Sequence, residues 1–147
     1  MPNQIASPID VADVAARLRI AMARMSRRLR RETDGEHSAS AISALATVSR
    51  LGVVSLGELA EAEGISRPSM TVLAASLEAQ RLLVREPEAG DRRLVRVRIA
   101  PAGKQALARS RTRRNAYFAK RLRRLGENEL RILEGASGIL EQLLAEA

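Results

Sequence analysis

The middle of the chain encodes two short helices separated by a tight turn. This feature constrains the fold more than any other. Ser55 is a favourable N-cap residue, and Glu58 three positions later completes a capping box. Gly64 suits the end of this helix, and Ser66 suits the cap of a second one. Pro68 then falls in the first turn, where its missing N–H costs nothing. This order of caps and ends predicts a helix-turn-helix.

The second of these helices has one apolar side and one side that remains free. Its apolar residues recur at the i, i+3, i+4, i+7 spacing of a buried helix face: Met70, Leu73, Ala74 and Leu77. The residues expected to face outward are Arg67, Pro68, Ser69, Thr71, Val72, Ala75 and Ser76. The pattern therefore predicts a helix that packs on a core with one face and leaves the other open.

A period of two replaces the helical period after this helix, which predicts a β-hairpin. Residues 82–84 begin a short strand, residues 87–90 make a turn, and residues 94–99 return. The returning strand alternates between apolar and basic residues: Val95, Arg96, Val97, Arg98 and Ile99. The segment Asp91-Arg92-Arg93 falls near the hairpin tip. A helix-turn-helix followed by such a hairpin is a winged helix-turn-helix, and it predicts binding to double-stranded DNA.

MarR-family transcriptional regulators have a core signature that this chain resembles over ELAEAEGISRPSMTVLAASLEAQRLLVREPEAGDRRLVRVRIAPAGKQAL. The signature has an ELA helix, a Ser-capped recognition helix, an Asp-Arg-Arg wing and a strand leading into a helix that begins near Thr/Ala-x-x-Gly. The resemblance is close over about residues 38–107. In layout it extends to the whole chain, with one long helix before the motif and two after it. It implies a homodimer that is joined through these outer helices.

The recognition helix is expected to lie in the major groove with its N-terminal residues at the base edges. The predicted contact residues are Ser66, Arg67, Pro68, Ser69, Thr71 and Val72. Many relatives carry a basic residue at the positions that match Val72 and Ser76, where this chain is uncharged. This departure shifts the expected recognition toward Arg67, the wing and the shape of the DNA.

The predicted contact residues of the wing are Asp91, Arg92, Arg93 and Arg96. The resemblance implies that Arg93 enters the minor groove, while Asp91 pairs with an arginine and holds the tip. Arginine suits the narrow, electronegative minor groove of A·T-rich DNA. The alternative interpretation of this segment is an ordinary charged hairpin tip.

Composition agrees with a nucleic-acid partner and argues against an enzyme. The 147 residues include 25 basic and 17 acidic side chains, a formal net charge of +8. The chain has no cysteine and one histidine, and it has no Gly-rich phosphate loop or metal-spaced cluster, so neither catalysis nor a cofactor is expected. It also has neither a signal-peptide pattern nor an apolar run of membrane-spanning length. We therefore expect a cytoplasmic protein without a membrane partner.

The flanking segments predict long amphipathic helices, so the expected fold is mainly α with a small β-hairpin wing. We expect an N-terminal dimerisation helix within residues 1–36, a winged DNA-binding lobe over 37–100 and C-terminal dimerisation helices over 101–147, all in one intertwined domain. The first helix ends in a basic run: Arg27, Arg28, Arg30 and Arg31. This run is either a solvated helix end, a phosphate contact or a positive lining between subunits.

Together these patterns predict a homodimeric, sequence-specific DNA-binding regulator, acting as a repressor on a palindromic operator. Family resemblance suggests release by a small anionic or lipophilic effector, and the candidate pocket residues are Arg111, Arg114, Tyr117 and Phe118. Packing and solvated charge would explain the same four residues. Two alternative functions are a sequence-independent architectural DNA-binding protein and a winged-helix module that binds another protein.

Overall fold

The computed structural model describes residues 8–33, 35–88 and 90–146; the side chains of residues 33, 88 and 91–94 lie outside this description. The described elements are α1 (Val11–Thr33), α2 (Ala39–Leu51), β1 (Val54–Ser55), α3 (Leu56–Glu63), α4 (Arg67–Ala79), β2 (Leu83–Glu88), β3 (Asp91–Ile99), α5 (Pro101–Leu122) and α6 (Glu127–Ala145). The prediction of a mainly helical chain with a small sheet is confirmed.

Local capping explains where the central helices begin and end. The Ser55 hydroxyl accepts the Glu58 N–H at 3.2 Å, and the Glu58 carboxylate accepts the Ser55 N–H at 2.9 Å, so the expected capping box is confirmed. Ser66 caps α4 by accepting the Ser69 N–H at 3.3 Å. Gly64 ends α3 with φ +66°, a left-handed conformation that glycine adopts without strain. The helix-turn-helix is thus specified by residues within a few positions of each boundary.

The sheet is small and antiparallel, in the order β1-β3-β2. Its first strand, β1, is two residues long, and Val54 of this strand pairs with Val97 of β3. The turn expected over residues 87–90 is wrong in extent, because β2 continues through Pro87 to Glu88 and β3 begins at Asp91. Pro87 is tolerated there because β2 is an edge strand, and the pairing register shifts between Pro87 and Glu88. Ala89, part of the expected turn, lies outside the described residues.

One hydrophobic core lies under the recognition helix. Its largest fully buried side chains come from α2, α3, α4 and β3: Leu45, Val48, Leu59, Met70, Leu77 and Val97. The start of α5 closes this core, because Ala106 and Leu107 are also buried. Gly103 permits that approach, since a Cβ there would lie 2.2 Å from the Leu82 carbonyl oxygen. We call α2, α3, α4, the sheet and α5 up to Ser110 the winged lobe.

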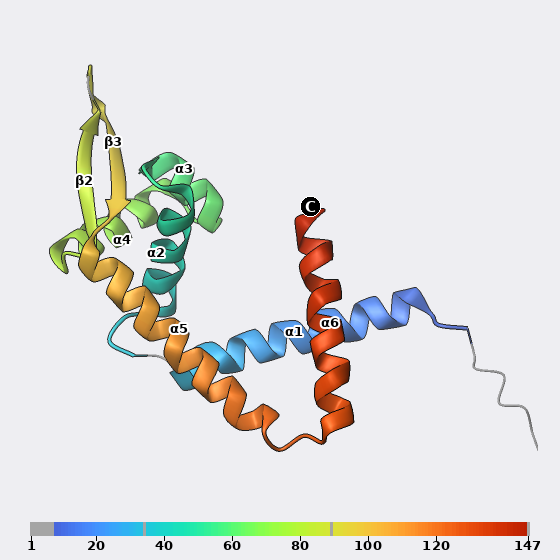
Figure 1. Ribbon diagram of the computed structural model, residues 1–147. Helices are drawn as coiled ribbons and strands as arrows, with labels where there is room; N and C mark the ends of the chain where they lie inside the picture. The colour runs from blue at the N-terminus through green and yellow to red at the C-terminus, as the bar shows by residue number, and fades with distance from the viewer. Residues whose placement is uncertain (1–7, 34, 89, 147) are drawn as a thin grey trace, which may run out of the picture.

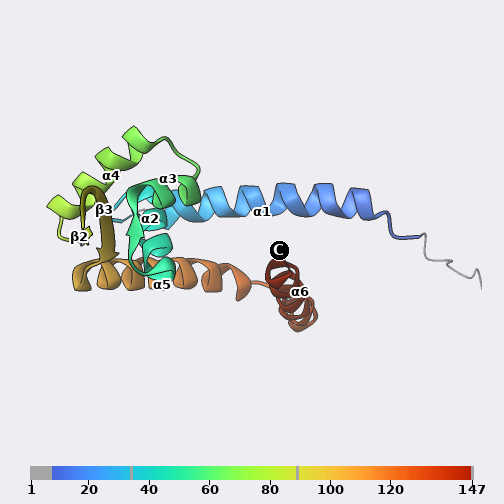
Figure 2. The ribbon, with the colours of Figure 1, turned by 90° about the horizontal axis from the view of Figure 1, so that it is seen from above.

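The remaining helices extend away from this lobe (Figure 1). Helix α1 packs against α5, and α6 stands apart at the far end of α5, as the view from above also shows (Figure 2). We call α1, α5 beyond Ser110, and α6 the helical body. Helix α6 has no buried residue in its described range, although it carries the apolar stripe expected from the sequence. The apolar surface of this body is therefore uncovered in a single chain.

Candidate nucleic-acid interface

The recognition helix α4 presents the outward face that the sequence predicts. Met70, Ala74 and Leu77 are buried and Leu73 is partly buried, which confirms the expected inner stripe. All the residues expected to face outward are exposed, namely Arg67, Pro68, Ser69, Thr71, Val72, Ala75 and Ser76. Val72 is 72% exposed, so an apolar side chain lies in the middle of this face without contributing to the core.

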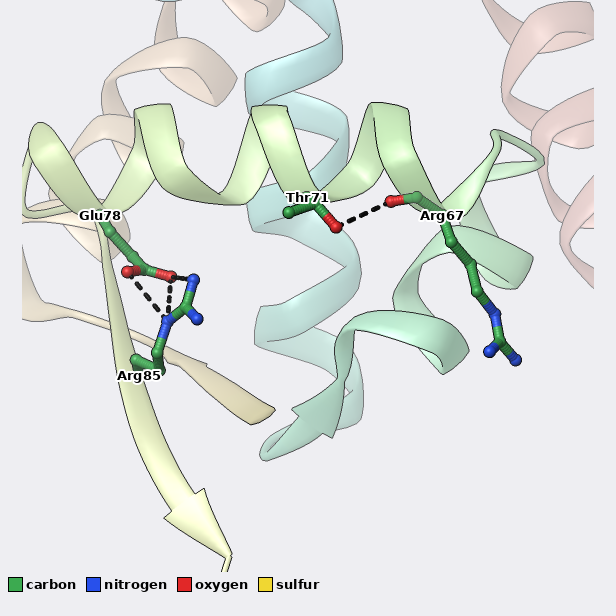
Figure 3. A network of polar contacts seen from close by, with 4 residues as sticks. All are labelled: Arg67, Thr71, Glu78 and Arg85. Carbon is green, nitrogen blue, oxygen red and sulfur yellow. Dashed lines mark hydrogen bonds and ion pairs between the residues drawn. The ribbon is translucent and has the colours of Figure 1, made fainter. Parts of the chain in front are cut away.

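Hydroxyl groups at the start of α4 are already engaged within the helix, whereas Arg67 extends from it. The Ser66 hydroxyl donates to the Ser69 hydroxyl at 2.8 Å, and the Thr71 hydroxyl donates to the Arg67 carbonyl at 2.9 Å (Figure 3). The Arg67 guanidinium lies over α3, 3.5 Å from where a Cβ of Gly57 would stand. Within the part of the chain that the structure describes, Arg67 makes no ion pair. It is therefore a charged group free to bind a phosphate or a guanine edge.

An ion pair joins the recognition helix to the wing. Arg85 Nε of β2 donates to both carboxylate oxygens of Glu78, at 2.9 and 3.1 Å, and one terminal nitrogen lies 2.9 Å from Glu78 Oε1 (Figure 3). This fork-like geometry fixes the base of β2 relative to α4. The pair cannot be predicted from the sequence, because two charges seven positions apart across a helix end form no local pattern that indicates contact.

The far end of α4 is linked to the connection between α1 and α2. Gln80 donates from its side-chain amide to the Ser76 carbonyl and hydroxyl, both at 3.2 Å, and its carbonyl oxygen lies 3.0 Å from His37 Nδ1. The Ser76 hydroxyl therefore participates in a contact within the protein. This link was also absent from the sequence interpretation, since His37 and Gln80 are 43 positions apart.

The base of the wing is a network of opposite charges. Arg98 pairs with Glu86 of the neighbouring strand. Arg96, predicted as a DNA contact, is half-buried and lies opposite Ser55 and Glu86 in the pairing register. Hydrogen bonds from the Ser55 N–H and hydroxyl lower the pKa of Glu58, and the positive charge of Arg96 lowers it further. The structure thus places Arg96 beside the α3 cap rather than at the hairpin tip.

The predicted tip residues Asp91, Arg92 and Arg93 open β3, and Glu88 pairs with Asp91 across the hairpin end. Their side chains lie outside the description. The backbone therefore brings the three residues to the end of the hairpin, as the sequence predicts, and their predicted DNA contacts stay predictions.

The four candidate effector residues do not line one pocket. Arg111 and Arg114 line a cavity of about 570 Å³ between α1, α2 and α5, together with Leu29, Ser43 and the buried Ser110. Phe118 lines a separate apolar cavity of about 690 Å³ formed with α1 and α6. The Tyr117 ring lies under Arg121, whose guanidinium carbon is 3.7 Å from the ring centroid. The structure therefore brings Arg111 and Arg114 together at one cavity and Arg114 and Phe118 together at a smaller one of about 360 Å³ against α1, and it places Tyr117 elsewhere.

Among the described residues, no group of three or more histidines, cysteines, aspartates or glutamates could hold a metal ion. No helix in the described ranges is both long enough and apolar enough to cross a membrane.

An exposed recognition helix fixed to a hairpin wing defines the class of winged helix-turn-helix transcriptional regulators. The MarR family model matches residues 38–94. An HTH-type transcriptional regulator of Mycobacterium leprae is 33% identical over 137 residues, which cover 92% of this chain and 96% of that protein. The chain therefore belongs to the MarR family. Its members are transcriptional regulators, which confirms the expectation that the chain is not an enzyme.

Solved structures agree with this assignment. A Pseudomonas aeruginosa PA01 protein described as a transcriptional regulator superposes with a TM-score of 0.77 at 31% identity, covering 90% of this chain and 94% of that one. A MarR family protein from Bacillus stearothermophilus gives a TM-score of 0.70 at 23% identity, covering 92% and 95% of the two chains. The second likeness concerns the fold alone.

Proposed function

We propose that this protein is a cytoplasmic homodimer that binds a palindromic DNA operator and represses transcription. The observation that carries the proposal is the outer face of α4, which is fully exposed, is not needed by the core and is fixed to a charged wing by the Glu78–Arg85 pair. A helix presented in this way fits the major groove, while the hairpin tip reaches the adjacent minor groove. The sign of regulation is proposed by analogy with the family.

The uncovered surface of the helical body supports the dimer. Ile132, Ile139 and Leu143 of α6 are 69%, 60% and 58% exposed, and the exposed apolar side chains continue on α1. Soluble monomers rarely leave such a continuous apolar surface in water. A second copy of the chain would cover it and would hold two α4 helices at half-sites about 34–36 Å apart, one turn of the duplex.

The cavity between α1, α2 and α5 supports regulation by a small anionic effector. Its lining combines three arginines, Arg30, Arg111 and Arg114, with one carboxylate, that of Glu63, and with apolar residues, so it keeps an excess of positive charge. A ligand bound there would bias the angle between the helical body and the winged lobe, and hence the spacing of the two recognition helices. Thermal denaturation with increasing benzoate tests this part. Stabilisation that Arg114→Gln abolishes would support it, and no stabilisation would remove an aromatic carboxylate as the effector class.

The main test is an anisotropy titration with the DNA upstream of the gene that encodes the protein. It is run at two salt concentrations and with unrelated DNA as competitor. We expect tight binding that resists the competitor and weakens log-linearly with salt. Binding that any DNA removes equally would indicate an architectural role instead. Salt-independent behaviour or no binding would contradict a DNA-binding regulator.

A further inference from the structure

The last two turns of α1 carry a row of arginines on one face. Arg24, Arg27, Arg28 and Arg31 follow the i, i+3, i+4, i+7 spacing, so their side chains lie above one another along the helix. With Glu32 they surround a surface hollow of about 500 Å³. We call these four residues the arginine stripe. One carboxylate against four guanidinium groups leaves the hollow strongly positive.

This stripe is not part of the packing of the chain. The side of α1 that faces α5 is marked by Met22, Met25, Ser26 and Leu29, which line the cavities shared with that helix. At 100° per residue, the four arginines fall on the opposite side of the helix. All four are exposed, and none of them makes an ion pair with another residue in the described ranges. By contrast, Arg17 nearer the start of α1 pairs with Asp13 at 3.6 Å.

Helix α1, which carries this charge, lies on the same side of α5 as the recognition helix (Figure 2). The C-terminal end of α1 leads directly into the winged lobe. The stripe is roughly 10 Å long, from a rise of 1.5 Å per residue, which is comparable to the distance spanned by four successive phosphates of one strand along the duplex axis. Guanidinium groups bind phosphates in a forked geometry.

We infer that the arginine stripe is a second DNA-binding surface, which contacts the phosphate backbone outside the bases read by α4 and the wing. The inference rests on the proposed function. The stripe would add sequence-independent affinity and a steeper salt dependence, because each phosphate contact releases condensed counterions. It would carry no base specificity, since phosphates are the same at every position.

The experiment compares two charge-matched variants in the salt titration with operator DNA. R27Q/R28Q removes two charges from the stripe, and R123Q/R124Q removes two exposed charges directly after the C-terminal end of α5. Glutamine has a helix propensity similar to that of arginine, so both variants should keep their folds. Sedimentation equilibrium and circular dichroism verify assembly and helicity.

We expect R27Q/R28Q to make the slope of log K against log [salt] shallower by about two to four units per dimer. The dimer would lose up to four phosphate contacts, and each contributes roughly 0.9 to the slope. Discrimination against unrelated DNA should stay as in the wild type, and R123Q/R124Q should keep the wild-type slope. Equal slopes for both variants and the wild type would overturn the inference and leave the proposed function intact. A shift of the monomer–dimer equilibrium in R27Q/R28Q would also overturn it, because the stripe would then be a subunit contact. Failure of the wild type to bind would instead contradict the proposed function.

Discussion

Within one chain, the winged lobe buries its apolar side chains, whereas the helical body leaves apolar side chains exposed. In the lobe, the side chains of Leu45, Leu59 and Leu77 are fully buried. In the body, Ile132 and Leu144 of α6 remain 69% and 78% exposed, although the helix is as regular and as amphipathic as any in the lobe. The difference teaches that helix formation and core formation are separate. The lobe buries its apolar side chains within one chain, whereas the body leaves apolar faces of α1 and α6 exposed.

The largest expected effect comes from a cavity in the lobe. Leu59→Ala removes a side chain that is completely buried between α3 and the core, and it should lower the free energy of unfolding by about 2–5 kcal/mol. Urea denaturation followed by circular dichroism measures the change. Val72→Ala, on the exposed outer face of α4, is the matched control, with an expected change within about 0.5 kcal/mol. Equal losses in the two variants would show that burial within the lobe does not determine its stability.

The second effect should appear in assembly rather than in folding. Ile139→Glu puts a carboxylate into the apolar face of α6 and should weaken a dimer by about 3 kcal/mol, more than a hundredfold in dissociation constant, because the charge would be buried without a partner. Sedimentation equilibrium measures the dissociation constant. Glu141→Gln on the same helix should leave it unchanged. A dimer that tolerates Ile139→Glu would mean that the subunits meet through another surface.

A third substitution should change DNA affinity while the winged lobe and the helical body stay folded. Arg93→Ala should weaken operator binding by about 1–3 kcal/mol, because the side chain is proposed to enter the minor groove. The anisotropy titration measures this change, and Arg123→Ala is the control at the distant end of α5. Unchanged affinity with Arg93→Ala would remove the wing tip from the DNA-binding mechanism.

Structural features that depend on residues close together in the chain could be predicted from the sequence. The Ser55–Glu58 box, the Ser66 cap and the end at Gly64 each involve residues within four positions, so their chemistry can be recognised without the fold. The inner stripe of α4 was predicted for the same reason. These features fixed the helix-turn-helix and hence the face that carries the candidate site.

Contacts between distant residues were missed, because only the assembled sheet and helices bring them together. The Glu78–Arg85 pair depends on how β2 leaves the end of α4, and the His37–Gln80 contact spans 43 positions. The strand through Pro87 was missed because proline reads as a turn residue, and its tolerance depends on β2 being at the sheet edge. The candidate effector residues were grouped by nearness in the sequence. In the structure, Arg114 lines the cavity between α1, α2 and α5, whereas the Tyr117 ring lies under the guanidinium group of Arg121.

The smallest expected effect concerns the pH dependence of the lobe and involves Glu58. The pKa of Glu58 is lowered from the usual 4.5, and the largest cause is the hydrogen bond from the Ser55 N–H. The folded state therefore favours the ionised carboxylate. The contribution of this carboxylate to stability is therefore fully present above pH 4.5 and is lost as the pH falls through the lower, folded-state value. Glu58→Gln should lower the midpoint of thermal denaturation at pH 7, and its difference from the wild type should shrink below pH 4.5.

Glu61→Gln, another exposed glutamate of α3, is the matched control for this measurement and should not reproduce the pH-dependent difference. The comparison separates the cap from a general loss of negative charge on the helix. The body has no part in this cap, so disrupting assembly with Ile139→Glu should leave the pH dependence of Glu58→Gln unchanged. A pH dependence that disappears with the dimer would mean that the lobe depends on the body for its local structure, contrary to the independence inferred from its core.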